Sequence, residues 1–239
     1  MLKLLFLTTT LLSSAVLADK EAVANNLSRF FGDIDQANIV PSSFTGAYEV
    51  ILHSPIDSIL VSKDGRYLIQ GDVVDLTTRK LMPANPRVKL IKKTLINTIA
   101  EQDKIIYKAD SEKHVIHVFT DVDCPFCRKL HLGMSKMNDL GITVKYLAAP
   151  LASLHPKAQS KMQRIWCAAD RKQAMDNYKH NGKLPETKDC KNPVATQLRI
   201  SQQLGVNGTP AIFLADGTHL PGYLKPSALI KEIQQSLGQ

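Results

Sequence analysis

The amino-acid sequence predicts an α+β protein with two structured domains of unequal size. From residue 104 onward, β-branched apolar runs alternate with segments of helical periodicity, which is typical of a sheet covered by helices. Before residue 80, short strands are separated by turn signals. The breaker cluster Met82-Pro83-Ala84-Asn85-Pro86 lies between the two patterns. We expect a small α+β domain over residues 19–80, a linker helix over 81–103 and a larger domain over 104–239.

The first 18 residues have the features of a secretory signal peptide. Lys3 forms a short basic region, residues 4–12 are apolar, and Val16-Leu17-Ala18 resembles a small-residue cleavage site. The apolar stretch is shorter than the roughly 20 residues that a membrane-spanning helix needs. We expect cleavage after Ala18 and export to an oxidising space such as a bacterial periplasm, where disulfides persist.

The elements of the first domain follow from local patterns. Apolar spacing predicts an amphipathic helix over residues 21–31. The turn signals Ser54-Pro55 and Lys63-Asp64-Gly65 separate strands expected over 47–53, 58–61, 67–69 and 72–75. About 60 residues bury a small fraction of their surface, so this domain would gain stability from dimerisation.

The linker and the larger domain show longer periodic segments. Val88, Ile91, Leu95 and Ile99 have helical spacing over residues 87–102. Glycines follow two later helical stretches, at the position where helices commonly end. The expected elements are strands over 114–120, 142–148, 209–214 and 220–223, helices over 124–140, 194–204 and 226–237, and a largely helical segment over 157–179.

Cys124 and Cys127 form a C-x-x-C motif where a strand gives way to a helix. Unpaired backbone N–H groups and the positive end of the helix dipole favour a thiolate at Cys124. Pro125 fits the first helical position, where its missing N–H is tolerated. Two other interpretations remain open: half of a zinc site completed by Cys167, Cys190 or a histidine, and a purely structural disulfide. The motif favours a dithiol redox site.

Charge and motifs exclude several function classes. The net charge is +8, but basic residues occur as short pairs such as Lys92-Lys93 and Arg128-Lys129. A nucleic-acid partner would require a clustered basic stripe with interleaved aromatics, so none is predicted. There is no G-x-G-x-x-G or P-loop, and the seven histidines are scattered. We predict no metal and no cofactor.

A set of motifs occurs in a characteristic order along the chain: Phe119-Thr120-Asp121, Cys124-Pro125-Phe126-Cys127, Lys129-Leu130-His131, Leu140-Gly141-Ile142-Thr143-Val144, Ile165-Trp166-Cys167-Ala168, Leu204-Gly205-Val206-Asn207-Gly208-Thr209-Pro210-Ala211, Gly217-Thr218 and Pro221-Gly222-Tyr223. They resemble the thioredoxin fold, and most closely the periplasmic protein-disulfide isomerases of the DsbC/DsbG type. A weaker match runs over residues 64–71. The family usually has Gly-Tyr or a similar pair inside C-x-x-C, and Pro125-Phe126 departs from that.

The resemblance implies an architecture and partners. The fold class is α+β, with a C-terminal thioredoxin-like fold carrying a helical insertion and a small N-terminal dimerisation domain joined by a linker helix. The family implies a homodimer whose cleft receives misfolded secreted proteins with non-native disulfides. It also implies a membrane thiol reductase of the DsbD type that keeps the site reduced. A structural disulfide between Cys167 and Cys190 is implied as well, with a second redox pair as the alternative.

Neighbours of the C-x-x-C motif have predicted roles. The resemblance implies a cis Thr209-Pro210 bond, with the Thr209 backbone facing the motif and pairing with substrate. Asp123 is either a helix cap or a carboxylate that opposes the Cys124 thiolate. His131, one helical turn after Cys127, either tunes that cysteine or packs in the domain. We expect Phe126 to be an exposed apolar contact for unfolded substrate.

The predicted activity is disulfide isomerisation. Cys124 attacks a non-native disulfide, a mixed disulfide forms, and Cys127 resolves it if the substrate stalls. Three alternatives remain: an oxidase or a reductase of sulfenylated cysteines on the same fold, a redox-independent chaperone, and a zinc protein.

Overall fold

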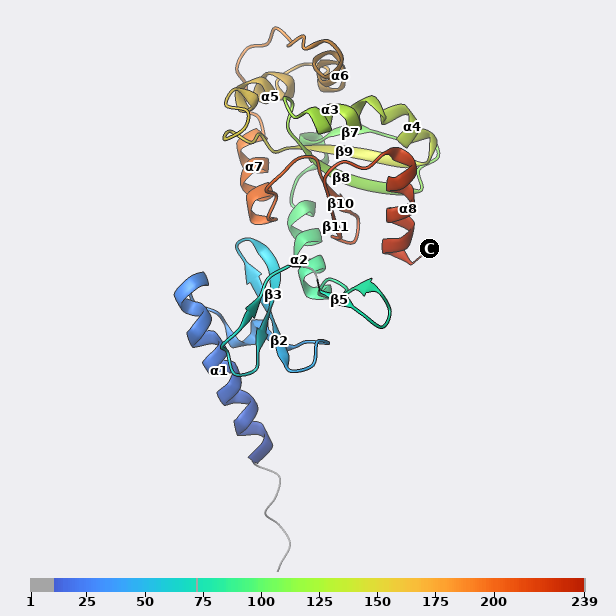
Figure 1. Cartoon of the computed structure of the whole chain (residues 1–239). Coiled ribbons are helices and arrows are strands. Elements are labelled where there is room, and N and C mark those ends of the chain that lie inside the picture. The colour runs from blue at the N-terminus through green and yellow to red at the C-terminus, as the bar shows by residue number, and fades with distance from the viewer. Residues whose placement is uncertain (1–10, 72, 239) are drawn as a thin grey trace, which may run out of the picture. The chain divides into compact units, whose positions relative to one another are not determined.

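The computed structural model describes residues 11–71 and 73–238, with side chains from residue 19 onward. The chain divides into two compact units between Asn85 and Pro86 (Figure 1). The predicted signal peptide depends largely on residues 1–10, which lie outside the described residues. Within the described part, no helix combines the length and apolarity needed to cross a membrane.

The first unit is a helix packed on a four-stranded antiparallel sheet. Helix α1 (Leu11–Phe31) precedes a short 3-10 helix (Gln36–Asn38). The sheet order is β1-β2-β3-β4, from β1 (Ile39–Pro41), β2 (Ala47–His53), β3 (Ile56–Ser62) and β4 (Leu68–Ile69). Strands β5 (Val74–Asp75) and β6 (Lys80–Leu81) form a separate hairpin. The core joins Val23 and Leu27 of α1 to the inward side chains of the sheet.

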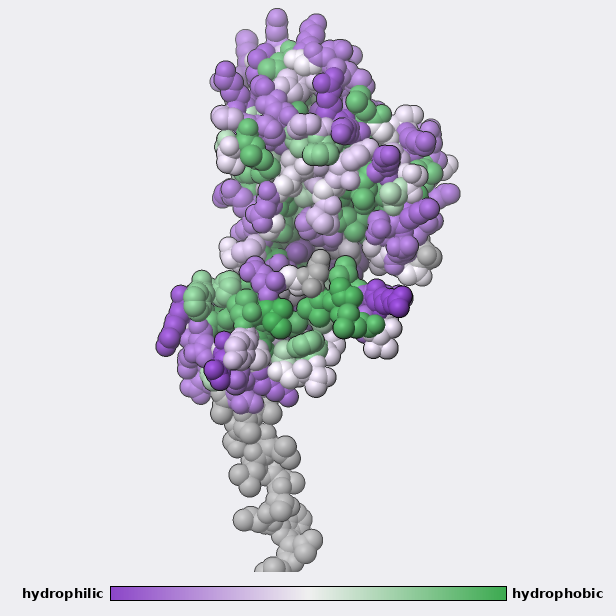
Figure 2. Space-filling model, in the orientation of Figure 1, coloured by the Kyte–Doolittle hydropathy of each residue, from purple (hydrophilic) through white to green (hydrophobic). Residues whose placement is uncertain are grey.

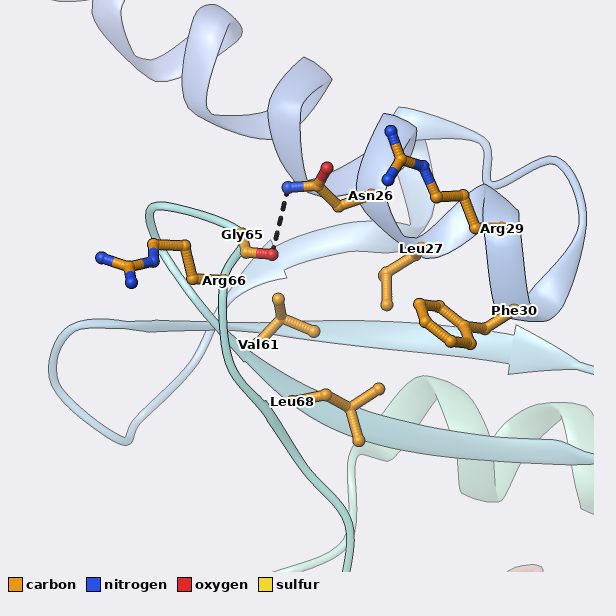
Figure 3. A pocket seen from close by; sticks show the side chains of 8 residues that line it. All are labelled: Asn26, Leu27, Arg29, Phe30, Val61, Gly65, Arg66 and Leu68. Carbon is orange, nitrogen blue, oxygen red and sulfur yellow. Dashed lines mark hydrogen bonds between the residues drawn. The ribbon is translucent and has the colours of Figure 1, made fainter.

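Apolar side chains also remain exposed on this unit. Figure 2 shows hydrophobic residues gathered on its visible face. A pocket of about 320 Å³ lies between α1 and the β3–β4 segment, where the Asn26 side chain donates to the Gly65 carbonyl at 3.2 Å (Figure 3). The pocket is lined by Asn26, Leu27, Arg29, Phe30, Val61, Gly65, Arg66 and Leu68. The exposed large apolar residues of this unit are Phe30, Phe31, Phe44, Tyr67, Leu68, Ile69, Val74, Leu76 and Leu81.

The second unit contains a five-stranded mixed sheet with the order β11-β10-β8-β9-β7. Its strands are β7 (Ile105–Tyr107), β8 (His114–Thr120), β9 (Ile142–Ala148), β10 (Ala211–Leu214) and β11 (His219–Pro221). Strands β8 and β9 pair in parallel at the centre, and the other pairs are antiparallel. Strand β8 is therefore buried in the middle of the sheet, and its last residues deliver the C-x-x-C motif.

Helices cover this sheet and enclose one large core. They are α3 (Pro125–Leu132), α4 (Met134–Asp139), α5 (Ala158–Trp166), α6 (Arg171–Asn181), α7 (Val194–Gln203) and α8 (Pro226–Leu237). Helix α2 (Pro86–Asn97) and a 3-10 turn at Glu101–Asp103 precede the sheet, and Lys89 of α2 forms an ion pair with Asp216 at 3.3 Å. The helical insertion consists of α5 and α6, and α6 packs on α3. After α4 the chain turns at Gly141, whose φ is +81° and where a Cβ would lie 2.8 Å from the Ser111 carbonyl, so only glycine fits.

Several expected helices are shorter or divided. The helix expected over 124–140 breaks at Gly133, which lacks the side chain that favours helix and has Pro226 packed beside it. The stretch 157–179 forms two helices, because Asp170 caps a new one by accepting from the Gln173 N–H at 2.8 Å. The helix expected over 87–102 ends at Asn97. The sequence patterns of the first domain do not predict β1, β6 or the start of α1 at Leu11.

Candidate active site

The C-x-x-C motif lies at the first turn of α3. Cys124 is the N-cap residue, and its sulfur accepts from the Cys127 N–H at 3.5 Å. Pro125 is the first helical residue. The sulfur of Cys124 thus replaces the oxygen of an ordinary capping residue, and the helix dipole and orphan N–H groups act on it directly.

Cys124 has the properties of an attacking thiol. The pKa of its thiol falls from about 9 to about 5, chiefly because the Cys127 thiol donates to it; burial opposes this shift, and Thr209 and the N–H groups of Cys127 and Phe126 reinforce it. In its thiol form Cys124 donates to the Thr209 carbonyl at 3.1 Å. The Thr209–Pro210 bond is cis, as the resemblance implied. The Thr209 backbone therefore faces the first sulfur.

Cys127 differs from Cys124 in its hydrogen bonds and in the direction of its pKa shift. It is fully buried, and its sulfur accepts from the Asp121 N–H at 3.5 Å. Burial raises the pKa of this thiol well above its ordinary value, and the hydrogen bond to Cys124 adds to the effect. At neutral pH the pair is therefore one thiolate and one thiol, which is the state needed for nucleophilic attack by the first cysteine.

Asp123 is not the helix cap. Its carboxylate accepts from Lys161 Nζ at 2.8 Å on both oxygens and from the Tyr178 hydroxyl at 2.5 Å. Burial alone would raise the pKa of Asp123, but the hydrogen bonds from Lys161 and Tyr178 outweigh it and lower the pKa. The charge of Asp123 is largely neutralised at its own position. The expectation of a capping role is wrong, because the Cys124 sulfur occupies that site.

His131 lies in the packed interior behind the motif. Its ring is 3.2 Å from the Asp176 carboxylate through Nε2 and 3.5 Å from the Tyr146 hydroxyl through Nδ1. Burial lowers the pKa of His131 to about 4. The packing role that the sequence left open is therefore the one that its contacts support, and an influence on Cys127 stays a prediction.

Phe126 is 53% exposed between two buried cysteines. The Lys129 ammonium lies over the face of its ring, 5.0 Å from the ring centre. An exposed phenyl ring beside the attacking sulfur is available to an apolar side chain of a substrate. Its role in substrate contact stays a prediction.

Cys167 and Cys190 form a disulfide with Cα atoms 5.7 Å apart. This bridge ties the end of α5 to the loop before α7, next to the fully buried Trp166. Because the two sulfurs bond each other, neither is available to complete a zinc site with Cys124 and Cys127. No cluster of three His, Cys, Asp or Glu side chains suited to a metal occurs among residues 11–71 and 73–238.

Sequence reasoning missed the charged residues that surround the motif. These are Lys161 and Lys179, which come from the helical insertion. Asp121 belongs to a motif that the sequence did show, and the structure adds that it is fully buried and accepts from the Leu151 N–H at 2.7 Å. Lysine side chains are almost always exposed, so a lysine at the end of the segment expected to be helical gives no sign of burial. The spacing of four between Lys179 and the buried Met175 is the signal that could have placed it on the inner face.

Comparisons with known proteins agree with this architecture. A family model described as a thioredoxin-like domain matches residues 100–237, and one described as the disulfide bond isomerase protein N-terminal domain matches residues 14–87. The thiol:disulfide interchange protein DsbC of Escherichia coli K12 is 36% identical over 236 residues, covering 99% of this chain and 94% of that protein.

Two further relatives extend the match. The DsbC protein of Dickeya dadantii is 37% identical over 225 residues, with 94% of this chain and 90% of that protein covered. A crystal structure of a disulfide interchange protein from Neisseria gonorrhoeae superposes with a TM-score of 0.53 at 34% identity, covering 58% of this chain and 98% of that one. The α+β class with a C-terminal thioredoxin-like domain is thereby confirmed, and the chain belongs to the DsbC family of thiol:disulfide interchange proteins.

Proposed function

We propose that this protein rearranges non-native disulfides in secreted proteins through Cys124 and Cys127. The observation that carries the proposal is the asymmetry of the pair: the pKa of Cys124 falls to about 5, whereas burial raises that of Cys127. A thiolate at the first position attacks readily at neutral pH, and a protonated second cysteine leaves the mixed disulfide time to rearrange.

The proposed reaction begins when the Cys124 thiolate attacks one sulfur of a substrate disulfide. A bond forms between Cys124 and that sulfur, the substrate S–S bond breaks, and the other substrate sulfur leaves as a thiolate. That thiolate can attack another disulfide of the substrate and finally displace Cys124, with no net redox change. If it does not, Cys127 attacks Cys124 and releases a reduced substrate, which leaves the enzyme oxidised.

Two surfaces support binding of an unfolded chain near the sulfur. The Thr209 backbone lies 3.1 Å from Cys124 and could pair with an extended substrate segment by β-augmentation. Phe126 adds an exposed apolar ring on the helix side. A substrate held between Pro210 and Phe126 would present its disulfide to Cys124.

The first unit is proposed to form a homodimer over residues 19–80, with residues 81–103 as the linker. Its exposed large apolar residues and the hydrophobic area visible on this unit in Figure 2 support pairing with a second copy. We further propose export by the signal peptide over residues 1–18, a periplasmic location, and a membrane thiol reductase of the DsbD type that returns Cys124 and Cys127 to the dithiol form.

The decisive experiment measures recovery of activity from a scrambled, fully oxidised multi-disulfide protein in glutathione buffer. The full chain is compared with Cys124→Ser, with Cys127→Ser and with no protein. Recovery that requires Cys124 supports isomerisation. Rapid oxidation of a reduced substrate without recovery would refute it in favour of an oxidase, and suppression of aggregation that survives Cys124→Ser would identify a chaperone instead.

A further inference from the structure

Lys179 is a buried ammonium group beneath the C-x-x-C motif. Only 1% of the residue is exposed. Its Nζ donates to the Asp121 carbonyl at 2.8 Å and to the Val122 carbonyl at 3.1 Å, both in the loop between β8 and α3. Two neutral carbonyls compensate poorly for the hydration that a cation loses on burial, so the Lys179 ammonium requires a further stabilising partner.

Asp121 connects Lys179 to both cysteines. Its carbonyl accepts from Lys179 Nζ and from the Cys124 N–H at 3.4 Å, and its own N–H donates to the Cys127 sulfur at 3.5 Å. The ammonium and the buried sulfur are therefore held against the same residue. Lys179 is also the group that most lowers the pKa of Cys127, against the larger effect of burial.

The other ionisable groups around this place have their own partners. The Asp121 carboxylate accepts from the Leu151 N–H and lies 3.1 Å from His155, and Asp123 is paired with Lys161. The pKa of His131 is lowered by burial to about 4, so that ring is neutral at pH 7.

Among the residues that the structure describes, the other ionisable groups packed around Lys179 supply no second cation for the Cys127 sulfur. Tyr146, on β9, has a pKa raised by burial and by Cys127 and stays protonated. On helix α6 itself, Asp176 binds the Tyr107 hydroxyl, Tyr178 binds Asp123, and His180 is exposed. Burial lowers the pKa of Lys179, and the Cys127 sulfur is the strongest of the groups that act in the opposite direction, ahead of Asp121, Cys124 and Asp123, as expected if the ammonium and a Cys127 thiolate stabilise each other.

We propose that Lys179 is a positioning residue for the resolving step, in which its buried ammonium group stabilises the Cys127 thiolate and so sets how long a substrate stays bound to Cys124. This inference rests on the proposed function. In the step concerned, the Cys127 thiol gives its proton to solvent and the resulting thiolate attacks the Cys124 sulfur. The Cys124–Cys127 bond forms, the bond from Cys124 to the substrate sulfur breaks, and the substrate leaves as a thiolate.

The test follows the two thiolates released when the dithiol protein meets excess aromatic disulfide reagent in a stopped-flow instrument. The first release reports attack by Cys124 and depends on reagent concentration. The second reports resolution by Cys127 and does not. The variants are Lys179→Met, which removes the charge and the donors, and Lys179→Gln, which keeps an N–H donor. Lys172→Met is the matched control, because Lys172 is an exposed lysine of the same helix.

Loss of the charge should move the pH midpoint of the second release upward by about one unit or more, which leaves about tenfold less Cys127 thiolate at pH 7. Because a thiolate of higher pKa is also about threefold more nucleophilic, the second release should slow at least about threefold. The first release should change less than about threefold, because the donors named at Cys124 remain. Lys172→Met should match the unmodified chain. A second-release pH profile that is unchanged in both Lys179 variants would overturn the inference, as would a loss of rate that is equal for both releases at every pH.

A second measurement keeps Lys179 in place and serves if both variants unfold. The pKa of Lys179 is followed by NMR of its side chain in Cys124→Ser and in Cys124→Ser/Cys127→Ser. Linkage requires a higher Lys179 pKa where Cys127 is present, and equal values would reject the inference. Neither measurement uses a misfolded protein, so a failure of isomerisation and a failure of this inference are distinguishable.

Discussion

The hydrogen bond between the two thiols should dominate the acidity of Cys124, and it can be tested with a matched pair of variants. Cys127→Ala removes the donor, whereas Cys127→Ser keeps a hydroxyl at the same place. The pKa of Cys124 is about 5, and the contribution of Cys127 to that shift is the largest. We expect Cys127→Ala to raise the pKa by about one unit, equivalent to about 1.4 kcal/mol, and Cys127→Ser to leave it near 5, because the hydroxyl keeps a donor at that place.

The pH–rate profiles of the two variants should therefore cross. A thiol of pKa about 6 is about 9% ionised at pH 5, against half for one of pKa 5. Its thiolate is intrinsically about threefold more nucleophilic, because reactivity in thiol–disulfide exchange rises with pKa. Cys127→Ala should therefore react about twofold more slowly than Cys127→Ser at pH 5 and about threefold faster at pH 8.

The assay is the second-order rate with an aromatic disulfide between pH 4 and pH 9, alongside thiolate absorbance. Both variants lack a resolving thiol, so each trace reports attack by Cys124 alone. Coincident profiles would refute the assignment of the low pKa to the thiol–thiol hydrogen bond, and would leave the helix N-terminus as its cause.

Three further outcomes are expected. Asp123→Asn should lower the pKa of Cys124 slightly, because it leaves the Lys161 cation without its carboxylate. The pKa of Asp123 is itself lowered, so the native chain should be about 1 kcal/mol more stable than the variant above pH 4, and this difference should disappear in stronger acid. Urea unfolding at several pH values measures the difference. Replacing Cys167 and Cys190 by alanine should cost about 3 kcal/mol of unfolding free energy, because the bridge closes a loop with a sequence separation of 23; a loss below about 1 kcal/mol would contradict the loop-closure argument. Phe126→Ser should raise the KM for a misfolded protein about fivefold, corresponding to about 1 kcal/mol of lost apolar contact, while reaction with a small disulfide reagent stays unchanged.

The sequence predicted correctly the bounds of those helices and strands that are determined by neighbouring residues. The strand Ala47–His53 and the helix Pro226–Leu237 have the expected bounds, because a turn follows the first and a proline starts the second. The strand Ile105–Tyr107 was missed, since three residues carry too little periodicity. The break at Gly133 was missed for a different reason: the apolar spacing continues through it, and Pro226, far along the chain, packs beside it.

The candidate site divides in the same way. Cys124 and Cys127 were found from their spacing and from the strand-to-helix context, and the cis peptide before Pro210 followed from the family resemblance. A helix cap was one of the two roles predicted for Asp123, because short acidic residues before a helix often have that role. Its true partner, Lys161, lies 38 positions away, and no sequence spacing connects them. Ion pairs between residues far apart in the chain could therefore not be predicted from the sequence.

The dipeptide inside the motif bears on the balance between isomerisation and oxidation. Pro125 has no N–H, but a capping side chain accepts from the second and third helical residues, so the Cys124 sulfur still receives the N–H groups of Phe126 and Cys127. The pKa falls to about 5 chiefly because the Cys127 thiol adds a further donor. A stabilised thiolate makes the dithiol form harder to oxidise and the disulfide form a stronger oxidant. A dithiol form that resists oxidation favours isomerisation, which requires a reduced Cys124, and this resistance comes chiefly from the Cys127 thiol rather than from the dipeptide.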